Sequence, residues 1–305
     1  MPIVRLGEVG DNQRVMTRST YASVFRPDLF AGQVHIVTGA GSGIGRCIAH
    51  ELSALGAELV LVGRTRAKLE QVQAELAAVS GSARVQVIDI RDEAAVQQGI
   101  AEIVQRSPRI HGLVNNAGGQ FPSPLENISK RGFEAVVATN LTGGFLMSRE
   151  VFTASMREHG GAIVNIVADM WNGMPGMGHS GAARAGVVNL TKTAAYEWAR
   201  NAVRVNAVAP GYIASSGLDR YPESMRELIV GLGQHVPLGR IGTEAEVSAA
   251  VCFLLSPAAA FITGVTLAVD GGAPLGSDLV PLPAAPPAPA FEGFLLARPP
   301  DVLKP

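Results

Sequence analysis

The stretch VHIVTGAGSGIG, residues 34–45, decides the fold of this 305-residue chain. Its first five residues are mostly β-branched, as in a buried strand, and glycines follow where a helical pattern begins. Gly39 allows a tight turn, Gly43 lets a phosphate approach the backbone, and Gly45 lets the helix pack close to the sheet. Free N–H groups at the helix start favour a bound anion. The stretch predicts a dinucleotide-binding turn formed by Gly39, Gly41, Ser42, Gly43, Ile44 and Gly45.

Short apolar runs alternate with helical patterns along the rest of the chain. Thr65 and Asp92 stand where side chains cap helices, and Gly56 stands where a left-handed residue ends one. Such alternation with right-handed crossovers predicts one α/β Rossmann domain over residues 32–272, a parallel doubly wound sheet with helices on both faces. The expected strands are Val34–Thr38, Leu59–Gly63, Val85–Ile90, Gly112–Asn115, Ile163–Val167, Val203–Val208 and Thr266–Val269.

Both ends of the chain differ from this body. Residues 1–31 show no clear period and are expected to form an N-terminal extension. Nine of the chain's 19 prolines fall in residues 273–305, which predicts an extended, Pro-rich C-terminal tail. Its one apolar segment is Phe291–Leu296. Two alternatives remain for this tail: it is solvated and docks somewhere, or it reaches across a subunit interface.

Composition excludes several classes of protein. Twenty-five Lys and Arg balance 26 Asp and Glu, so no global basic field attracts nucleic acid or anionic lipid. Two cysteines, Cys47 and Cys252, are too few for a disulfide scaffold or a cysteine-rich zinc site, and both are expected to be buried in helices. We expect no metal. No secretory h-region and no membrane-spanning apolar run occur, so we expect a soluble cytoplasmic protein with a small-molecule substrate.

The end of the second expected strand bears on the choice of dinucleotide. A chain that prefers NAD usually places Asp or Glu there, to accept a hydrogen bond from the ribose 2′-hydroxyl. This chain has Arg64 instead, with Arg66 and Lys68 nearby. A guanidinium suits a 2′-phosphate, so the sequence favours NADP(H). The alternative is that Arg64 is an ordinary solvated residue at a helix start.

The order and spacing of several motifs resemble the short-chain dehydrogenase/reductase family. They are Thr38-Gly39-x-x-x-Gly43-Ile44-Gly45, Asn115-Asn116-Ala117-Gly118, Asn140, Pro210-Gly211 and Asp270-Gly271-Gly272. The resemblance covers roughly residues 31–272 and implies a seven-stranded parallel sheet, usually in a tetramer. It also implies cofactor contacts from Asp89, Ile90, Asn116, Ala117, Gly118, Val167, Arg184, Pro210, Gly211 and Ile213.

The chain departs from the family at three of its four catalytic positions. Members usually carry Ser, Tyr and Lys together with Asn, and the Tyr and Lys lie four residues apart on one helix. Here Ser180 falls on the tyrosine position and Arg184 on the lysine position, while Val167 and Ala168 offer no hydroxyl. Of that set, Asn140 alone remains. Arginine stays charged, so Arg184 can hold a ribose but cannot shuttle protons.

These departures disfavour carbonyl reduction, because a serine hydroxyl delivers a proton to an alkoxide poorly. Conjugate reduction of an enoyl thioester demands less, since hydrogen-bond donors can stabilise the enolate. Gly118-Gly119-Gln120-Phe121 and the segment 179–187 also resemble peroxisomal trans-2-enoyl-CoA reductases, with 2,4-dienoyl-CoA reductases as more distant relatives. The resulting hypothesis is NADP(H)-dependent reduction of a trans-2-enoyl thioester, with catalytic residues Ser180, Arg184, Asn140 and His179.

Alternatives stay open at this stage. His179 is either a proton donor, because an imidazole titrates near neutral pH, or a packed residue at a helix start. Asp169 could orient it or face water. The first rival function is a carbonyl reductase or alcohol dehydrogenase acting on a ketoacyl thioester or a terpenoid alcohol. The second is a catalytically silent NADP(H)-binding sensor or scaffold.

Overall fold

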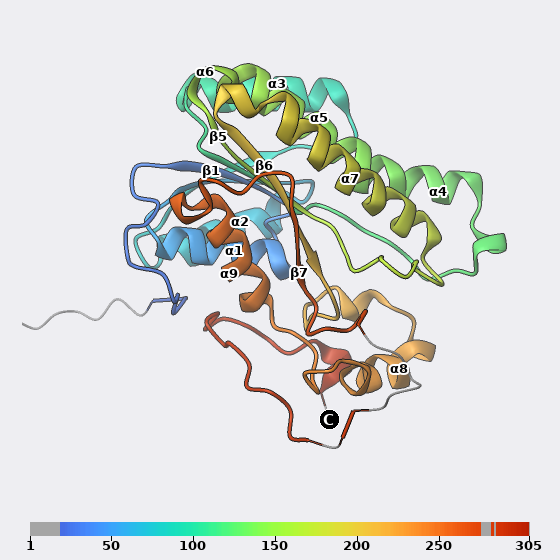
Figure 1. Ribbon diagram of the computed structural model, residues 1–305. Helices are drawn as coiled ribbons and strands as arrows, with labels where there is room; N and C mark the ends of the chain where they lie inside the picture. Colours follow the sequence, from blue (N-terminus) through green and yellow to red (C-terminus); the bar gives the residue numbers. More distant parts are fainter. Residues whose placement is uncertain (1–18, 276–281, 284, 305) are drawn as a thin grey trace, which may run out of the picture.

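A computed structural model describes residues 19–275, 282–283 and 285–304 of the chain. Residues 1–18 of the expected N-terminal extension, and residues 276–281, 284 and 305 of the Pro-rich tail, lie outside the described residues. The core is a seven-stranded parallel sheet in the order β3-β2-β1-β4-β5-β6-β7, with helices on both faces (Figure 1). The predicted fold class, a parallel doubly wound Rossmann sheet, is confirmed.

Six of the seven expected strands lie within two residues of their predicted bounds. The third was misplaced: it spans Ser82–Val87, because its pairing with the second strand runs from Glu58–Ser82 to Gly63–Val87 and stops where that strand stops. The apolar Ile88 and Ile90 that suggested a longer strand are buried in the following loop instead. The strands are β1 Val34–Thr38, β2 Glu58–Gly63, β3 Ser82–Val87, β4 Gly112–Asn115, β5 Gly161–Ile166, β6 Val203–Pro210 and β7 Thr266–Val269.

The helices form two layers on the sheet (Figure 1): α1, α2 and α9 on one face, and α3, α5 and α7 on the other. Each face has its own apolar core. Among the described residues, no helix combines the length and the apolar character that crossing a membrane would need. The α-helices are α1 Gly43–Ala54, α2 Arg66–Ala77, α3 Glu93–Arg106, α4 Lys130–Val137, α5 Gly143–Val151, α6 Arg157–His159, α7 Gly178–Glu197, α8 Arg226–Gly231 and α9 Glu244–Leu255.

Most of the predicted helix boundaries are confirmed. Gly56 follows α1 with φ +88°, and the Asp92 side chain accepts the Ala95 N–H at 3.1 Å. Thr65 is the N-cap of α2, but its side chain makes no capping hydrogen bond, so the prediction that this side chain caps the helix was wrong. Cys47 and Cys252 are free, buried thiols in α1 and α9, as predicted.

The apolar segment of the tail packs on its own chain. Gly293 accepts the Ala22 N–H at 2.8 Å, and the Leu295 N–H donates to Thr20 at 3.1 Å. The buried Phe294 ring stacks on Tyr21, and the Arg46 guanidinium lies 4.9 Å from its centre. The last described residues, around the short helix η9 (Asp301–Leu303), lie beside α8 (Figure 1). The tail therefore ties the N-terminal segment to the body of the domain.

Replacing Phe294 by Ala tests this docking. Removing a buried aromatic ring costs about 3 kcal/mol, so Phe294→Ala should release the tail and raise amide hydrogen exchange at Leu295 and Ala22. The matched control is Phe261→Ala, because Phe261 is fully exposed. Exchange at those two amides that stays equal in both variants would show that Phe294 does not hold the tail.

Candidate active site

The glycine-rich loop after β1 has the geometry of a phosphate cradle. Gly39 and Gly43 adopt φ of +66° and +57°, a region that favours glycine. A Cβ on Gly45 would overlap the Gly39 carbonyl oxygen, and one on Gly41 would lie 2.9 Å from the Lys68 side chain. Helix α1 therefore starts close to the sheet with its first N–H groups open to an anion. These residues fit the predicted dinucleotide pyrophosphate.

A hydrogen-bonded clamp joins the carboxyl ends of β1 and β4. The Thr38 hydroxyl donates to Val114 at 3.2 Å and accepts the N–H groups of Asn116 and Ala117, each at 3.0 Å. The Asn116 amide donates back to the Thr38 carbonyl at 3.0 Å. The strand order reverses between these two strands, which is where open parallel sheets bind ligands. Sequence reasoning had given Thr38 no role.

An arginine and an aspartate lie at the strand ends where the adenosine half of the dinucleotide is expected. Arg64 is exposed at the end of β2. Asp89 follows β3 and accepts from the Arg91 guanidinium at 2.9 Å, which lowers the pKa of the Asp89 carboxyl. Arg64 adds to that lowering through its charge. Ile90 is buried against Gly143. The charged Asp89 carboxylate is thus already paired with Arg91, and Arg64 is an exposed cation at this strand end.

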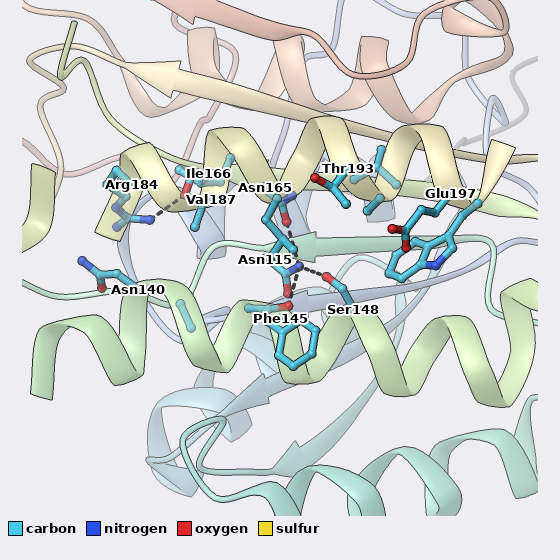
Figure 2. A pocket seen from close by; sticks show the side chains of 16 residues that line it. Asn115, Asn140, Phe145, Ser148, Asn165, Ile166, Arg184, Val187, Thr193 and Glu197 are labelled. Carbon is cyan, nitrogen blue, oxygen red and sulfur yellow. Dashed lines mark hydrogen bonds between the residues drawn. The ribbon is translucent and has the colours of Figure 1, made fainter. Parts of the chain in front are cut away.

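Arg184 lies on α7, is partly buried and points to the carboxyl ends of β4 and β5. Its guanidinium donates to the Ile166 carbonyl at 2.6 Å (Figure 2), and its Nε has no partner among the described residues. A Cβ on Gly118 would lie 2.5 Å from Nη2. Burial lowers the pKa of Arg184 to about 10, so the group stays charged at neutral pH. The next residue after β5, Val167, is buried.

Asn140 lies in a π-helical turn, η2 Ala138–Thr142, between α4 and α5. Its side-chain oxygen accepts the Gly119 N–H at 2.9 Å, and its amide nitrogen lies 3.4 Å from the Ser180 oxygen. Such π-turns are frequent at functional sites, because the extra residue redirects a side chain. Asn140 therefore links the loop after β4 to the start of α7.

Ser180 donates its proton to a residue that sequence reasoning had not assigned to the site. Its hydroxyl donates to the Gln120 side-chain oxygen at 2.7 Å, and the Gln120 amide donates to the Tyr221 phenol at 2.8 Å. In the sequence, Gln120 stands out only as part of the segment Gly118-Gly119-Gln120-Phe121. Tyr221 lies 101 residues further along the chain, so no local pattern could place it there.

His179 is fully buried beneath Phe121, whose ring meets it edge-on at 4.3 Å. Its Nδ1 accepts the Ser180 N–H at 2.9 Å, which places the proton of the neutral imidazole on Nε2. That Nε2 has no partner among the described residues. No hydrogen bond is found there between His179 and Asp169, whose pKa is raised by burial. His179 packs beside the site and holds the start of α7.

The expected nicotinamide end is closely packed. β6 ends at Pro210, and the Gly211 N–H donates to Val269 at 3.0 Å. A Cβ on Gly211 would lie 2.8 Å from the Asp270 Cα, so glycine is required by close packing. Ile213 is buried and forms an isolated bridge with Gly242. Within the described residues, no group of three or more His, Cys, Asp or Glu could hold a metal ion.

A cavity of about 90 Å³ lies behind the site, between α5 and α7 (Figure 2). Arg184 and Asn140 line one end and Glu197 the other. In its middle, the Asn115 amide donates to Ser148 and to Asn165, each at 2.8 Å. Apolar side chains, among them Phe145, Val187 and Leu190, make up most of the remaining lining.

Comparisons with known proteins agree with this geometry. A family model described as Enoyl-(Acyl carrier protein) reductase matches residues 39–274. Peroxisomal 2,4-dienoyl-CoA reductase of Danio rerio is 35% identical over 260 residues, which cover 84% of this chain and 86% of that protein. A solved citronellol catabolism dehydrogenase of Pseudomonas aeruginosa is 57% identical, with a TM-score of 0.76, and covers 83% of this chain and 99% of that one.

A further solved structure holds a dinucleotide. A putative NAD(P)-dependent gluconate 5-dehydrogenase from Beutenbergia cavernae, with bound NADP, is 36% identical and has a TM-score of 0.75. The match covers 81% of this chain and 99% of that one. These relatives carry different activities on one fold.

Arg184 is predicted to hold the dinucleotide ribose. Arg184→Ala should raise the dissociation constant of NADPH about tenfold, the equivalent of about 1.4 kcal/mol, while Arg184→Lys should retain binding. Lys192→Ala is the matched control, because Lys192 is an exposed cation on the same helix. Calorimetry measures the constants, and thermal unfolding checks each variant. Normal NADPH binding by a folded Arg184→Ala variant would contradict this role.

Proposed function

Because the chain belongs to the short-chain dehydrogenase/reductase family, we propose that it is an NADP(H)-dependent oxidoreductase that reduces the C=C bond of a trans-2-enoyl thioester. The family uses NAD(P)(H), so oxidoreductase chemistry follows from membership. One observation carries the finer proposal. At the tyrosine and lysine positions of the family stand Ser180, which donates to Gln120, and Arg184, which is partly buried and charged.

The site is built to donate hydrogen bonds. Bound NADPH would supply the hydride for the β-carbon of the substrate. As that carbon accepts the hydride, negative charge develops on the thioester oxygen. The second N–H of the Gln120 amide has no acceptor among the described residues, so it can donate to that oxygen. Ser180 fixes the orientation of Gln120, and Asn140 and Arg184 keep the loop and helix in place.

Carbonyl chemistry fits the side chains of α7 less well. Reducing a ketone requires a proton for the alkoxide, and oxidising an alcohol requires a base for the hydroxyl proton. At the family's tyrosine and lysine positions, the Ser180 proton is already donated to Gln120, and the Arg184 guanidinium accepts no proton. Enolate formation needs only stabilising donors at its first step, which favours the enoyl thioester.

Apolar side chains around the start of α7 support an acyl substrate. Phe121 and Leu125 are exposed, and Leu125 approaches Gly178. Met177 adjoins Tyr221, and Met174 packs on Gly181. Thioether side chains adapt to varied apolar shapes, as an acyl chain requires. The curated relatives named 2,4-dienoyl-CoA reductases act on thioesters of this chemical class.

A second candidate function has its own support. The solved relative at 57% identity is described as a dehydrogenase of citronellol catabolism, which favours a terpenoid alcohol or its aldehyde. A branched, isoprenoid enoyl thioester would be consistent both with this relative's description and with the chemistry of the site.

We also propose that the protein forms the homotetramer that the family resemblance implies.

A substrate panel tests the proposal. Purified protein is assayed with NADPH and trans-2-enoyl-CoA, 2,4-dienoyl-CoA and 3-ketoacyl-CoA, and with NADP⁺ and citronellol, with products identified by mass spectrometry. The proposal requires a saturated acyl thioester from trans-2-enoyl-CoA. Faster turnover of 3-ketoacyl-CoA or citronellol would support the rival dehydrogenase. Binding of NADPH without turnover of any substrate would support a sensor.

Arg64 is predicted to select NADPH over NADH. Arg64→Ala should weaken NADPH binding about tenfold, because a charge-assisted contact with the 2′-phosphate is lost, and should leave NADH binding unchanged. Arg131→Ala is the control, because Arg131 is an exposed arginine on α4, far along the chain from this strand end. Fluorescence titration gives both constants. Equal affinities of the wild type for the two cofactors would refute NADP(H) preference.

A further inference from the structure

The segment between β6 and α9 brings a phenol to the candidate site. We call residues 213–235 the lid segment; it contains the short helices η5 (Leu218–Arg220) and η6 (Glu223–Met225), and α8. Tyr221 lies between η5 and η6 and is half-buried. Its hydroxyl accepts the Gln120 amide at 2.8 Å, so the lid segment contacts the hydrogen-bonded group at the start of α7.

Ser180, Gln120 and Tyr221 form a chain of hydrogen bonds at the start of α7. The Ser180 proton goes to the Gln120 oxygen, and one Gln120 N–H goes to the Tyr221 oxygen. The Tyr221 proton points to the Met177 sulfur at 3.8 Å, and a thioether is a weak acceptor. The phenol is therefore a strong donor without a strong acceptor among the described residues. A bound ligand that offers a better acceptor would take this proton.

The tail holds the lid segment in this position. The Val302 N–H donates to the Asp219 carboxylate at 3.1 Å, two residues before the tyrosine. The Arg226 guanidinium donates to the Lys304 carbonyl, also at 3.1 Å. Contacts on both sides of Tyr221 thus fix the backbone that carries it, so the phenol is positioned before any ligand binds.

We propose that Tyr221 is the proton donor of the reaction, supplied by the lid segment in place of the tyrosine that the family carries at the position of Ser180. This inference rests on the proposed function. The β-carbon accepts a hydride and its electron pair, the C=C electron pair moves to form the enolate, and the enolate collapses with a new bond from the α-carbon to the Tyr221 proton. The phenolate left behind regains a proton from solvent. One hydride and one proton are added, and the thioester stays intact.

Tyr221→Phe tests the proposal, because it keeps the ring and removes only the hydroxyl. The reaction is run in D₂O with NADPH and a trans-2-enoyl-CoA that the wild type reduces. We expect kcat to fall about 100-fold or more, as the loss of a general acid does, while the NADPH dissociation constant stays within twofold. We also expect the wild type to place deuterium on one face of the α-carbon, and the variant to place it on both faces. NMR of the product shows on which face of the α-carbon the deuterium lies.

Tyr196→Phe is the control, because Tyr196 is a highly exposed tyrosine near the far end of α7. It should keep both kcat and single-face labelling. A Tyr221→Phe variant with kcat within twofold of the wild type would overturn the proposal. So would a slower variant that keeps single-face labelling, since the phenol would then position the lid segment without delivering the proton. Failure of the proposed function shows differently: the wild type itself makes no saturated product, and the present proposal falls with it.

Discussion

A partly buried positive charge governs the construction of the site. Arg184 lies between α7 and the carboxyl ends of β4 and β5, and its guanidinium donates to the Ile166 carbonyl. Withdrawing a charge from water is costly unless it is hydrogen-bonded, so the helix and the two strand ends are held in one arrangement. The Thr38 clamp fixes the neighbouring strand end in the same crevice. Only Gly118, with no side chain, leaves room for the guanidinium.

The hydrogen bonds at the start of α7 follow from that arrangement. With Arg184 anchored, Ser180 lies one helical turn earlier, within reach of Asn140 and Gln120. The single hydroxyl proton of Ser180 is donated to Gln120. One N–H of Gln120 and the hydroxyl proton of Tyr221 therefore remain as donors for a ligand. The arrangement offers several donors, and its serine and arginine serve poorly as proton acceptors. That asymmetry is the basis of the proposal of conjugate reduction rather than alcohol oxidation, in a family that hosts both kinds of chemistry.

Local patterns predicted the sheet and the dinucleotide loop because their signals lie close together in the sequence. A strand, a glycine turn and a helix start occupy residues 34–45, and the seven strands are short apolar runs. Sequence patterns gave wrong predictions where contacts between distant parts of the chain set the local structure. The bounds of β3 follow the length of its neighbour, and its apolar end packs in a loop. Thr65 matched a capping position without making the bond.

The candidate site divides in the same way. Motif positions located Asn140, Ser180 and Arg184, which the structure brings together. His179, which the sequence offers as a proton donor or as a packed residue, lies beneath Phe121, and its Nδ1 accepts a backbone N–H. The sequence does not predict the roles of Gln120 and Tyr221, because their contacts join a loop after β4, the start of α7 and the lid segment. Such pairs have no periodicity or spacing that a sequence could display.

The most direct test of a donor-built site is a competition in a single reaction. A trans-2-enoyl-CoA and a 3-ketoacyl-CoA of the same chain length, at equal concentrations, are offered to the protein with NADPH. The initial ratio of saturated to 3-hydroxyacyl product gives the ratio of the two kcat/KM values. The account predicts that the saturated thioester dominates at least tenfold, a difference of about 1.4 kcal/mol in transition-state binding. A 3-hydroxyacyl product in equal or greater amount would contradict it.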